Sequence, residues 1–174
     1  AYDGVHLMHI TAPGQGNLQS LENGSMFMQA CNMADIDQDG VLDVFACHDD
    51  AVSRLWKGYE AGALNNNQAL MPLTSYDTGG YSNTDHSGNY GSVWTDFDRD
   101  GDIDLYIAKC RQFVNDPQDP RRVNQLWVND GEGNYTEEAS ERGLVFFEQS
   151  WTADFADIDN DGDMDMFLVN HDIP

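Results

Sequence analysis

A nine-residue acidic motif, D-x-D-x-D-G-x-x-D, occurs three times at a fixed spacing and constrains the fold more than any other feature. The copies occupy residues 35–43, 96–104 and 157–165, so their first aspartates are 61 residues apart in both intervals. A repeat of this length is typical of propellers and other repeat arrays, in which each repeat is one supersecondary unit. The sequence therefore predicts structural units of about 60 residues.

Each acidic motif has the composition of a divalent-cation site. Two like charges 4–5 Å apart repel by roughly 3–4 kcal/mol at an effective dielectric near 20, so a bound cation would relieve the repulsion among several carboxylates in one turn. Oxygen ligands without His or Cys favour Ca²⁺, with Mg²⁺ second and zinc disfavoured. We expect about three Ca²⁺ ions, held by the side chains at motif positions 1, 3, 5 and 9 and by the backbone carbonyl at position 7. The glycine at position 6 permits the sharp turn.

The predicted ligands are Asp35, Asp37, Asp39, Val41 and Asp43 in the first motif, Asp96, Asp98, Asp100, Asp102 and Asp104 in the second, and Asp157, Asp159, Asp161, Asp163 and Asp165 in the third.

Two other interpretations of the motif are less favourable. An EF-hand needs an acidic bidentate ligand at position 12, and the residues there are the apolar Ala46, Ile107 and Leu168, so an EF-hand is excluded. Acidic turns that are merely solvated would explain a single copy. Three copies at one spacing, each with its ninth aspartate, favour a metal site instead.

The segments around the motifs have the patterns of β-strands. Alternating side chains precede each motif at residues 29–34, 90–95 and 151–156, and short apolar runs follow at 44–47, 105–108 and 166–169. Each motif is thus predicted to be the turn of a hairpin. Third strands are expected at 53–57 and 124–128, a fourth near 134–137 after the Asp130-Gly131 turn, and one helical turn at 138–142.

Four strands in each unit of about 60 residues describe a propeller blade. The predicted fold class is therefore all-β: a β-propeller segment of four-stranded antiparallel blades with Ca-binding hairpin loops. Residues 1–25 are expected to hold the end of a preceding blade, with one strand at 6–11, and a connection. Residues 26–88 and 89–147 would form two blades and 148–174 a partial one. Closed propellers have about 4–8 blades, so further blades are expected from a longer chain or another protein.

The motif, its apolar strand and the later run N-x-L-W-x-N-D-G-x-G-N-Y at 124–135 together resemble the FG-GAP/VCBS repeat. The chain is most similar to the repeats that precede ASPIC/UnbV domains, and distantly similar to integrin α-subunit propeller blades. This resemblance implies that the motif aspartates are Ca²⁺ ligands in the hairpin between the first two strands of a blade. Tyr90-Gly91 approximates the "FG" element, but no Gly-Ala-Pro follows the second strands. Integrin-type ligand binding is therefore not carried over.

Charge and length exclude several classes of protein. The 31 acidic and 8 basic residues give a formal net charge of −23, whereas binding to nucleic acid or an anionic membrane requires a basic surface. No apolar run approaches the roughly 20 residues needed for membrane insertion. The start at Ala1 has no Met and no signal-peptide pattern, so we expect a processed chain or part of a longer one.

The cysteines and tryptophans leave two questions to the structure. Cys31 and Cys47 lie four residues before and after the first motif, which makes them either a cross-strand disulfide or two buried small residues. The four tryptophans recur with the repeat, and this favours a place in the core between blades over sugar-stacking platforms. They are Trp56, Trp94, Trp127 and Trp151.

The predicted function is a Ca-stabilised module for extracellular binding, adhesion or scaffolding, in a secreted, periplasmic or cell-surface protein. Its partners would be the remaining blades or another protein chain, with a carbohydrate or protein ligand and no nucleic acid. The alternative is the propeller portion of a secreted polysaccharide-active lyase or hydrolase whose active site lies outside or at the edge of this segment. An enzyme is the less favoured reading, because no catalytic motif occurs.

Overall fold

The computed structural model describes residues 4–23, 27–49, 53–59, 63–66 and 88–171. Every regular element in these residues is a β-strand, and every strand pairing is antiparallel, so the all-β prediction is confirmed. The strands are β1 Gly4–Ala12, β2 Gln15–Asn23, β3 Met28–Ala34, β4 Asp43–His48, β5 Arg54–Tyr59, β6 Ala63–Asn66, β7 Asn89–Thr95, β8 Asp104–Lys109, β9 Gln125–Asn129, β10 Tyr135–Glu137, β11 Gln149–Ala156 and β12 Asp165–His171.

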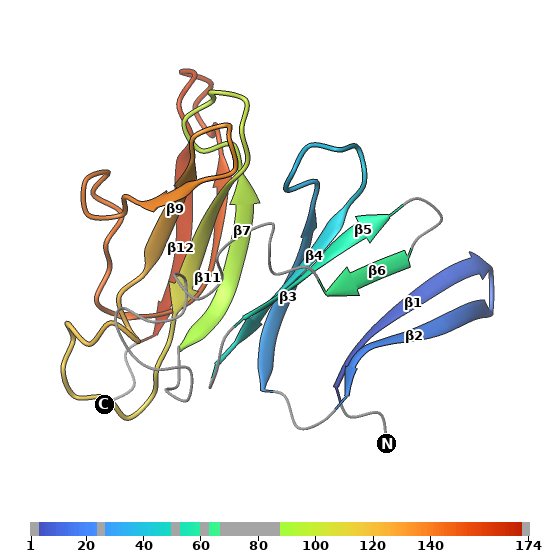
Figure 1. The fold of residues 1–174 in the computed structure, drawn as a ribbon. Coiled ribbons are helices and arrows are strands. Elements are labelled where there is room, and N and C mark those ends of the chain that lie inside the picture. The colour runs from blue at the N-terminus through green and yellow to red at the C-terminus, as the bar shows by residue number, and fades with distance from the viewer. Residues whose placement is uncertain (1–3, 24–26, 50–52, 60–62, 67–87, 172–174) are drawn as a thin grey trace.

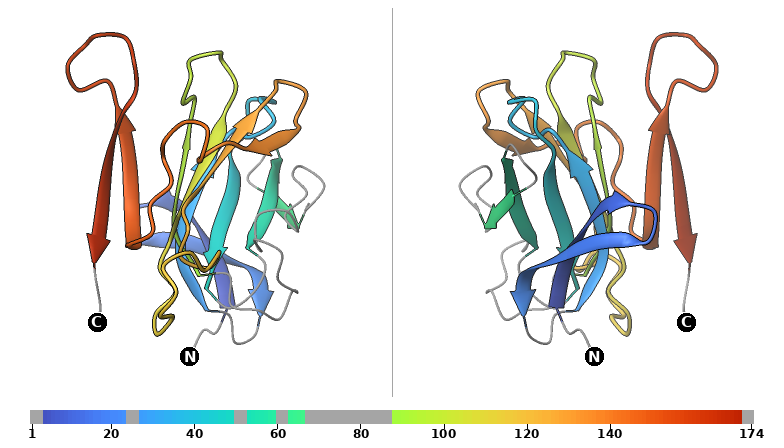
Figure 2. Two further views of the ribbon diagram at one scale, coloured as in Figure 1. Left: turned by 90° about the vertical axis from the view of Figure 1, so that its left-hand side faces the viewer. Right: turned by 90° about the vertical axis from the view of Figure 1, so that its right-hand side faces the viewer.

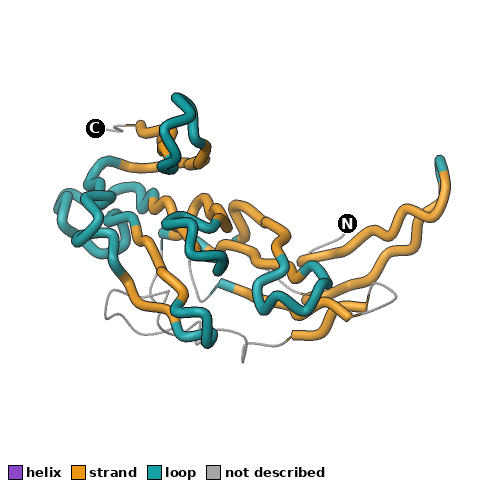
Figure 3. The backbone as a smooth tube through the Cα atoms, turned by 90° about the horizontal axis from the view of Figure 1, so that it is seen from above, coloured by secondary structure: helices purple, strands orange, loops and turns teal. Residues whose placement is uncertain are grey.

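The strands form four sheets that follow one another along an arc (Figure 1, Figure 3). The N-terminal hairpin pairs β1 with β2, and the first four-stranded sheet has the order β3-β4-β5-β6. The second four-stranded sheet repeats this order as β7-β8-β9-β10, and the C-terminal hairpin pairs β11 with β12. Strands β3, β7 and β11 begin successive units, and β7 contacts both β3 and β11 between sheets.

The first strand of each unit carries a β-bulge at the same place. The pairing register shifts between Met28 and Ala30, between Asn89 and Gly91, and between Ser150 and Thr152. The skipped residues are Gln29, Tyr90 and Trp151, which are 61 residues apart like the acidic motifs. The structural repeat therefore includes a local irregularity as well as the strands themselves.

Apolar layers between neighbouring sheets form the core. Val44, Ala46 and Trp56 pack toward the N-terminal hairpin, where they meet Val5 and Leu7. The opposite face of the same sheet packs against the second four-stranded sheet through Phe45, Cys47, Leu55, Leu105, Ile107 and Trp127. The second sheet packs in turn against the C-terminal hairpin through Tyr106, Ala108, Leu126, Val128, Ala153 and Phe155.

The tryptophans follow this layering with one exception. Trp56 and Trp127 are buried, and Trp94 packs edge-on against Phe45 with ring centroids 5.5 Å apart. These three confirm the prediction of a place between sheets. Trp151 packs edge-on against Tyr90 of the neighbouring sheet, but it is 39% exposed, so its predicted place in the buried core is wrong.

Sequence patterns missed two strands. Where a single strand was expected near the N-terminus, β1 turns back at Pro13-Gly14, with Gly14 at a φ of 75°, and pairs with β2. Pro-Gly is a turn signal that would have indicated this hairpin. Strand β6 has the sequence Ala-Leu-Asn-Asn, which has little intrinsic strand preference, and it is defined by its pairing with β5.

The expected helical turn at 138–142 is a single turn with one helical hydrogen bond. The Arg142 N–H donates to the Glu138 carbonyl at 3.0 Å, and Gly143 ends the turn with a φ of 72°. The Leu144 N–H then donates to the Ala139 carbonyl at 2.8 Å, which is the Schellman pattern of a helix end.

The disulfide alternative is excluded by strand register. Cys31 lies opposite Ala46, whereas Cys47 lies opposite Ala30. This offset of one residue places the two cysteines on opposite faces of the sheet, since successive side chains alternate. Both thiols are free.

Candidate metal centres

The three acidic motifs form the hairpin loops between β3 and β4, β7 and β8, and β11 and β12. We call residues 35–43, 96–104 and 157–165 the first, second and third acidic loops and number the positions in each from 1 to 9. All three lie on the same side of the molecule (Figure 1, Figure 2). The residue at position 4 has a left-handed backbone in each loop, with φ between 57° and 62°, and so does the glycine at position 6. The loops therefore share one backbone conformation.

The same hydrogen bonds hold each loop. At position 6 the glycine N–H donates to Oδ2 of the aspartate at position 1, and at position 7 the N–H donates to Oδ1 of the aspartate at position 5. The first bond measures 2.8 Å from Gly40 to Asp35, 3.1 Å from Gly101 to Asp96 and 3.2 Å from Gly162 to Asp157. The second measures 2.9 Å from Val41 to Asp39, 2.9 Å from Asp102 to Asp100 and 3.0 Å from Asp163 to Asp161.

The aspartate at position 9 anchors the loop to its sheet. In every loop its Oδ2 accepts the N–H of position 2, at 3.1 Å for Asp43, 2.8 Å for Asp104 and 2.9 Å for Asp165. In the two four-stranded sheets its Oδ1 also accepts an N–H from the third strand, that of Gly58 at 2.8 Å or Asn129 at 2.9 Å. Asp43 and Asp104 are consequently fully buried.

Burial disfavours the ionised form of the two buried carboxylates at position 9, Asp43 and Asp104. It raises the pKa of Asp104 to about 6 and raises the pKa of Asp43 as well, although the backbone hydrogen bonds oppose the shift in both cases. The neighbouring carboxylates of the same loops also raise both pKa values. A positive charge in either loop would therefore stabilise the ionised form.

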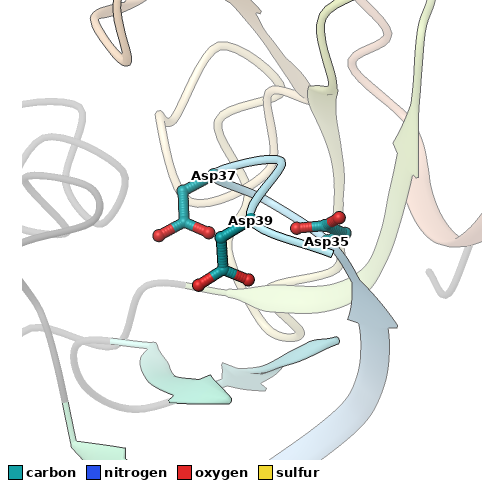
Figure 4. A group of neighbouring side chains, drawn as sticks. All are labelled: Asp35, Asp37 and Asp39. Atoms are coloured by element: carbon teal, nitrogen blue, oxygen red, sulfur yellow. The ribbon is translucent and has the colours of Figure 1, made fainter. Parts of the chain in front are cut away.

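Each loop brings three carboxylates together and also holds one buried, unpartnered carboxylate oxygen. One ligand atom from each of three aspartates lies within 4.8 Å of the others in every loop. At position 1, Oδ2 accepts the glycine N–H, while Oδ1 is buried and has no hydrogen-bond partner in the described part of the chain; these atoms belong to Asp35, Asp96 and Asp157. Figure 4 shows the three carboxylates of the first loop on one side of the turn. A buried carboxylate oxygen without a donor is costly, and a cation would satisfy it.

This geometry agrees with a comparison of the sequence with known families. Residues 96–168 match the FG-GAP-like repeat model. The match starts at position 1 of the second acidic loop and ends within β12, so it includes the second and third loops. It supports the FG-GAP/VCBS resemblance for this part of the chain. No curated protein matches the chain significantly.

The first acidic loop lies outside the residues that match the FG-GAP-like repeat. It nevertheless has the same internal hydrogen bonds as the second and third loops, which lie within the match. Of the predicted ligands, the structure brings together those at positions 1, 3 and 5 in the first loop and at positions 1, 3 and 9 in the other two. These nine are Asp35, Asp37, Asp39, Asp96, Asp98, Asp104, Asp157, Asp159 and Asp165.

The predicted ligands outside these nine fall into two groups. The side chains accept hydrogen bonds from other groups of the protein, and the backbone carbonyls at position 7 stay predictions. Both oxygens of Asp43 accept backbone N–H groups, and Asp100 and Asp161 accept the N–H of position 7. The Asp102 side chain accepts the Gln38 amide at 3.2 Å and so contacts the first loop. The backbone carbonyls of Val41, Asp102 and Asp163 stay predicted ligands.

Basic side chains at the loops were missed by sequence reasoning. Lys57 on β5 forms an ion pair with Asp37 and Asp39 of the first loop. Arg142 pairs with Asp98 of the second loop at 3.3 Å, and Arg99 reaches from the second loop to Asp157 of the third at 3.0 Å. Three of the eight basic residues of the chain thus lie at acidic loops. Arg99 is position 4 of the second motif, but its contact with the third loop depends on how the loops pack. Lys57 and Arg142 lie outside the motifs, and folding brings them to the loops.

Proposed function

We propose that the chain is a β-propeller-type module whose three acidic loops each bind one Ca²⁺. The single observation that carries this proposal is the buried, unpartnered Oδ1 at position 1, which recurs in all three loops beside two further carboxylates. Solvated acidic turns would instead expose these oxygens to water or give them donors.

The donor set favours calcium over other ions. The carboxylates at positions 1, 3, 5 and 9 and the carbonyl at position 7 are hard oxygen ligands that suit the six to eight contacts of Ca²⁺. Mg²⁺ requires a more regular octahedron and retains several waters, and zinc prefers nitrogen or sulfur. We expect the order of affinity Ca²⁺, then Mg²⁺, with zinc weakest.

The residues of each loop would hold the ion in a prepared site. The glycine N–H at position 6 fixes Oδ2 of the first aspartate and leaves Oδ1, which is buried and unpartnered, available to the ion. Position 9 fixes the loop to the sheet, through Gly58 in the first unit and Asn129 in the second. A bound cation supplies the positive charge that offsets repulsion among the carboxylates, and the hairpin then keeps one geometry.

Isothermal titration calorimetry of metal-free protein with CaCl₂ tests the proposal. We expect about three bound ions, with dissociation constants of about 10⁻⁶ to 10⁻⁴ M, and a lower melting temperature after chelation. Asp35→Asn, Asp96→Asn and Asp157→Asn should each remove one ion. Asp154→Asn, which removes the same charge from an exposed position on β11, should leave the stoichiometry unchanged. No uptake of Ca²⁺ by the wild-type protein would refute the proposal.

We further propose that another sheet of the same kind covers the open face of the C-terminal hairpin. In both four-stranded sheets, the residues two and four places after the aspartate at loop position 9 are fully buried. They are Phe45 and Cys47 in the first sheet and Tyr106 and Ala108 in the second. Their equivalents on β12, Phe167 and Val169, are 66% and 40% exposed. Because the equivalent residues of the other two units are covered by the next sheet, we propose that a further blade covers this face of β12. That blade would come from the same polypeptide or from a partner chain.

Sedimentation velocity over a range of concentrations tests whether this face is adhesive. We expect the wild-type chain to self-associate as its concentration rises, and Phe167→Lys to remain monomeric with an unchanged circular dichroism spectrum. A wild-type chain that stays monomeric at all concentrations would count against a docking face.

A module of this kind fits a role outside the cytoplasm, where millimolar Ca²⁺ would saturate even weak sites. We therefore propose binding, adhesion or scaffolding in a secreted, periplasmic or cell-surface protein, with a carbohydrate or protein ligand. The closer similarity to repeats that precede ASPIC/UnbV domains stays a prediction. No helix in the described ranges has the length and apolar character of a membrane span.

A further inference from the structure

Lys57 forms a contact that distinguishes the first acidic loop from the other two. Its ammonium group donates to Asp37 Oδ2 and to Asp39 Oδ2, the latter at 2.5 Å. These aspartates are two of the three carboxylates gathered in this loop. The Lys57 side chain is only 15% exposed, so the contact is partly shielded from solvent. An ordinary lysine ammonium is positively charged at neutral pH, so it offsets part of the negative charge of these two carboxylates.

The second sheet has no lysine at this place. Trp56 pairs with Val44 in the first sheet as Trp127 pairs with Leu105 in the second, so Lys57 and Val128 occupy equivalent positions. Val128 is buried in the layer that faces the C-terminal hairpin. The register of β5 therefore places the positive charge of Lys57 at the first acidic loop, whereas the second sheet has the apolar Val128 at the equivalent position.

The cations at the other loops engage fewer of the gathered carboxylates. Arg142 contacts only Asp98 of its trio, and it shares its guanidinium with Glu138 at 3.0 Å and with the Phe97 ring. Of the third trio, Arg99 contacts Asp157 alone among the described residues, and its guanidinium also lies 3.8 Å from the Met164 Sδ. Neither arginine bridges two carboxylates of one trio, as Lys57 does.

We infer that Lys57 is a tethered competitor of the divalent cation in the first acidic loop and makes this loop the weakest of the three sites. The inference rests on the function proposed above. A cation entering the first loop must share or displace an ammonium that already neutralises two of the ligands, and it is repelled by that charge. Asp35 Oδ1 stays unpartnered in the same loop, so the loop keeps an oxygen for the metal. The first site would therefore empty at a higher Ca²⁺ concentration than the other two.

Calorimetric titration of the full chain with CaCl₂ tests this inference. We expect two tighter sites and one weaker site in the wild type, and Asp37→Asn should abolish the weaker step. Lys57→Val, which introduces the residue of the equivalent position in the second sheet, should tighten that step by about tenfold, or about 1.4 kcal/mol. Lys57→Arg keeps the charge and should leave the step weak.

The outcomes separate this inference from the function on which it rests. No uptake of Ca²⁺ by any variant would refute the metal sites themselves. Three sites whose affinities do not change in Lys57→Val would refute the competitor role and leave the metal sites standing. A weaker step in Lys57→Val would show that the lysine organises the site, and this also overturns the inference. Urea unfolding in excess Ca²⁺ verifies that each variant is folded.

Discussion

Asp104 Oδ1 accepts a hydrogen bond from the Asn129 N–H at 2.9 Å and so joins the second acidic loop to the third strand of its own sheet. The same carboxylate accepts the Phe97 N–H through its other oxygen. Asp43 makes the equivalent pair of bonds in the first sheet. On the C-terminal hairpin, Asp165 retains only the bond to Ile158 among the described residues, and its side chain is exposed.

Asp104→Ala should therefore destabilise the protein more than Asp165→Ala. The first change leaves the buried Asn129 N–H and the partly buried Phe97 N–H without acceptors, and we expect a loss of about 1–3 kcal/mol of unfolding free energy. The second removes an exposed group with one bond, and we expect a loss below about 1 kcal/mol. Urea unfolding of the metal-free proteins measures both values without a contribution from bound cations. Equal losses would show that the bond to the third strand adds nothing.

Phe45 and Phe167 offer a matched test of packing between sheets. Both lie two residues after the ninth aspartate of their loops, but Phe45 is fully buried and Phe167 is 66% exposed. Phe45→Ala should lower the unfolding free energy by about 3–5 kcal/mol, because it opens a cavity in the core. Phe167→Ala should change it by less than about 1 kcal/mol. Denaturant unfolding checks the difference, and similar effects from both changes would contradict the assigned layers.

At Gly91, β7 comes close to the backbone of β11. A Cβ atom there would lie 2.7 Å from the Trp151 carbonyl oxygen, a backbone atom that cannot move without shifting its strand. Replacing a strand glycine by alanine normally stabilises by roughly 0.5–1 kcal/mol. We expect Gly91→Ala to reverse that sign and destabilise by about 1–3 kcal/mol.

The control for Gly91 is the opposite change at the equivalent bulge of the first sheet. Ala30→Gly should cost only the usual strand penalty of roughly 0.5–1 kcal/mol. Thermal unfolding of both variants decides the question. A stabilised Gly91→Ala protein would show that β7 and β11 are farther apart than the structure has them.

The three thiols should differ sharply in reactivity. Burial raises the pKa of Cys47 to about 12 and of Cys110 to about 11, so both stay protonated at pH 8, whereas Cys31 is exposed. Because the thiolate is the reactive form, Ellman's reagent should modify one thiol quickly in the folded protein and three after unfolding. Cys31→Ser should remove the fast phase. A fast phase that persists in this variant would contradict the burial of the other two.

Local sequence patterns predicted the parts of the fold that depend on neighbouring residues. The acidic motifs, their glycines and the flanking strand patterns act over a few residues, so they fixed three loops and the hairpins around them. The repeat of 61 residues also indicated the serial sheets. The sequence did not predict strand β6, because its strand conformation depends on pairing with β5 rather than on its own composition.

The tertiary structure decided the features that depend on register and on contacts between sheets. An offset of one residue between β3 and β4 separates Cys31 from Cys47, and no spacing count from the loop showed it. The register of β5 places Lys57 on Asp37 and Asp39, which lie 20 and 18 residues earlier in the chain, respectively. The sequence by itself thus determined where charges accumulate, because that depends on local order. The tertiary structure decided which basic side chains pair with those acidic residues. Strand pairing and the alternation of side chains along a strand bring residues that are distant in sequence together only in the folded protein.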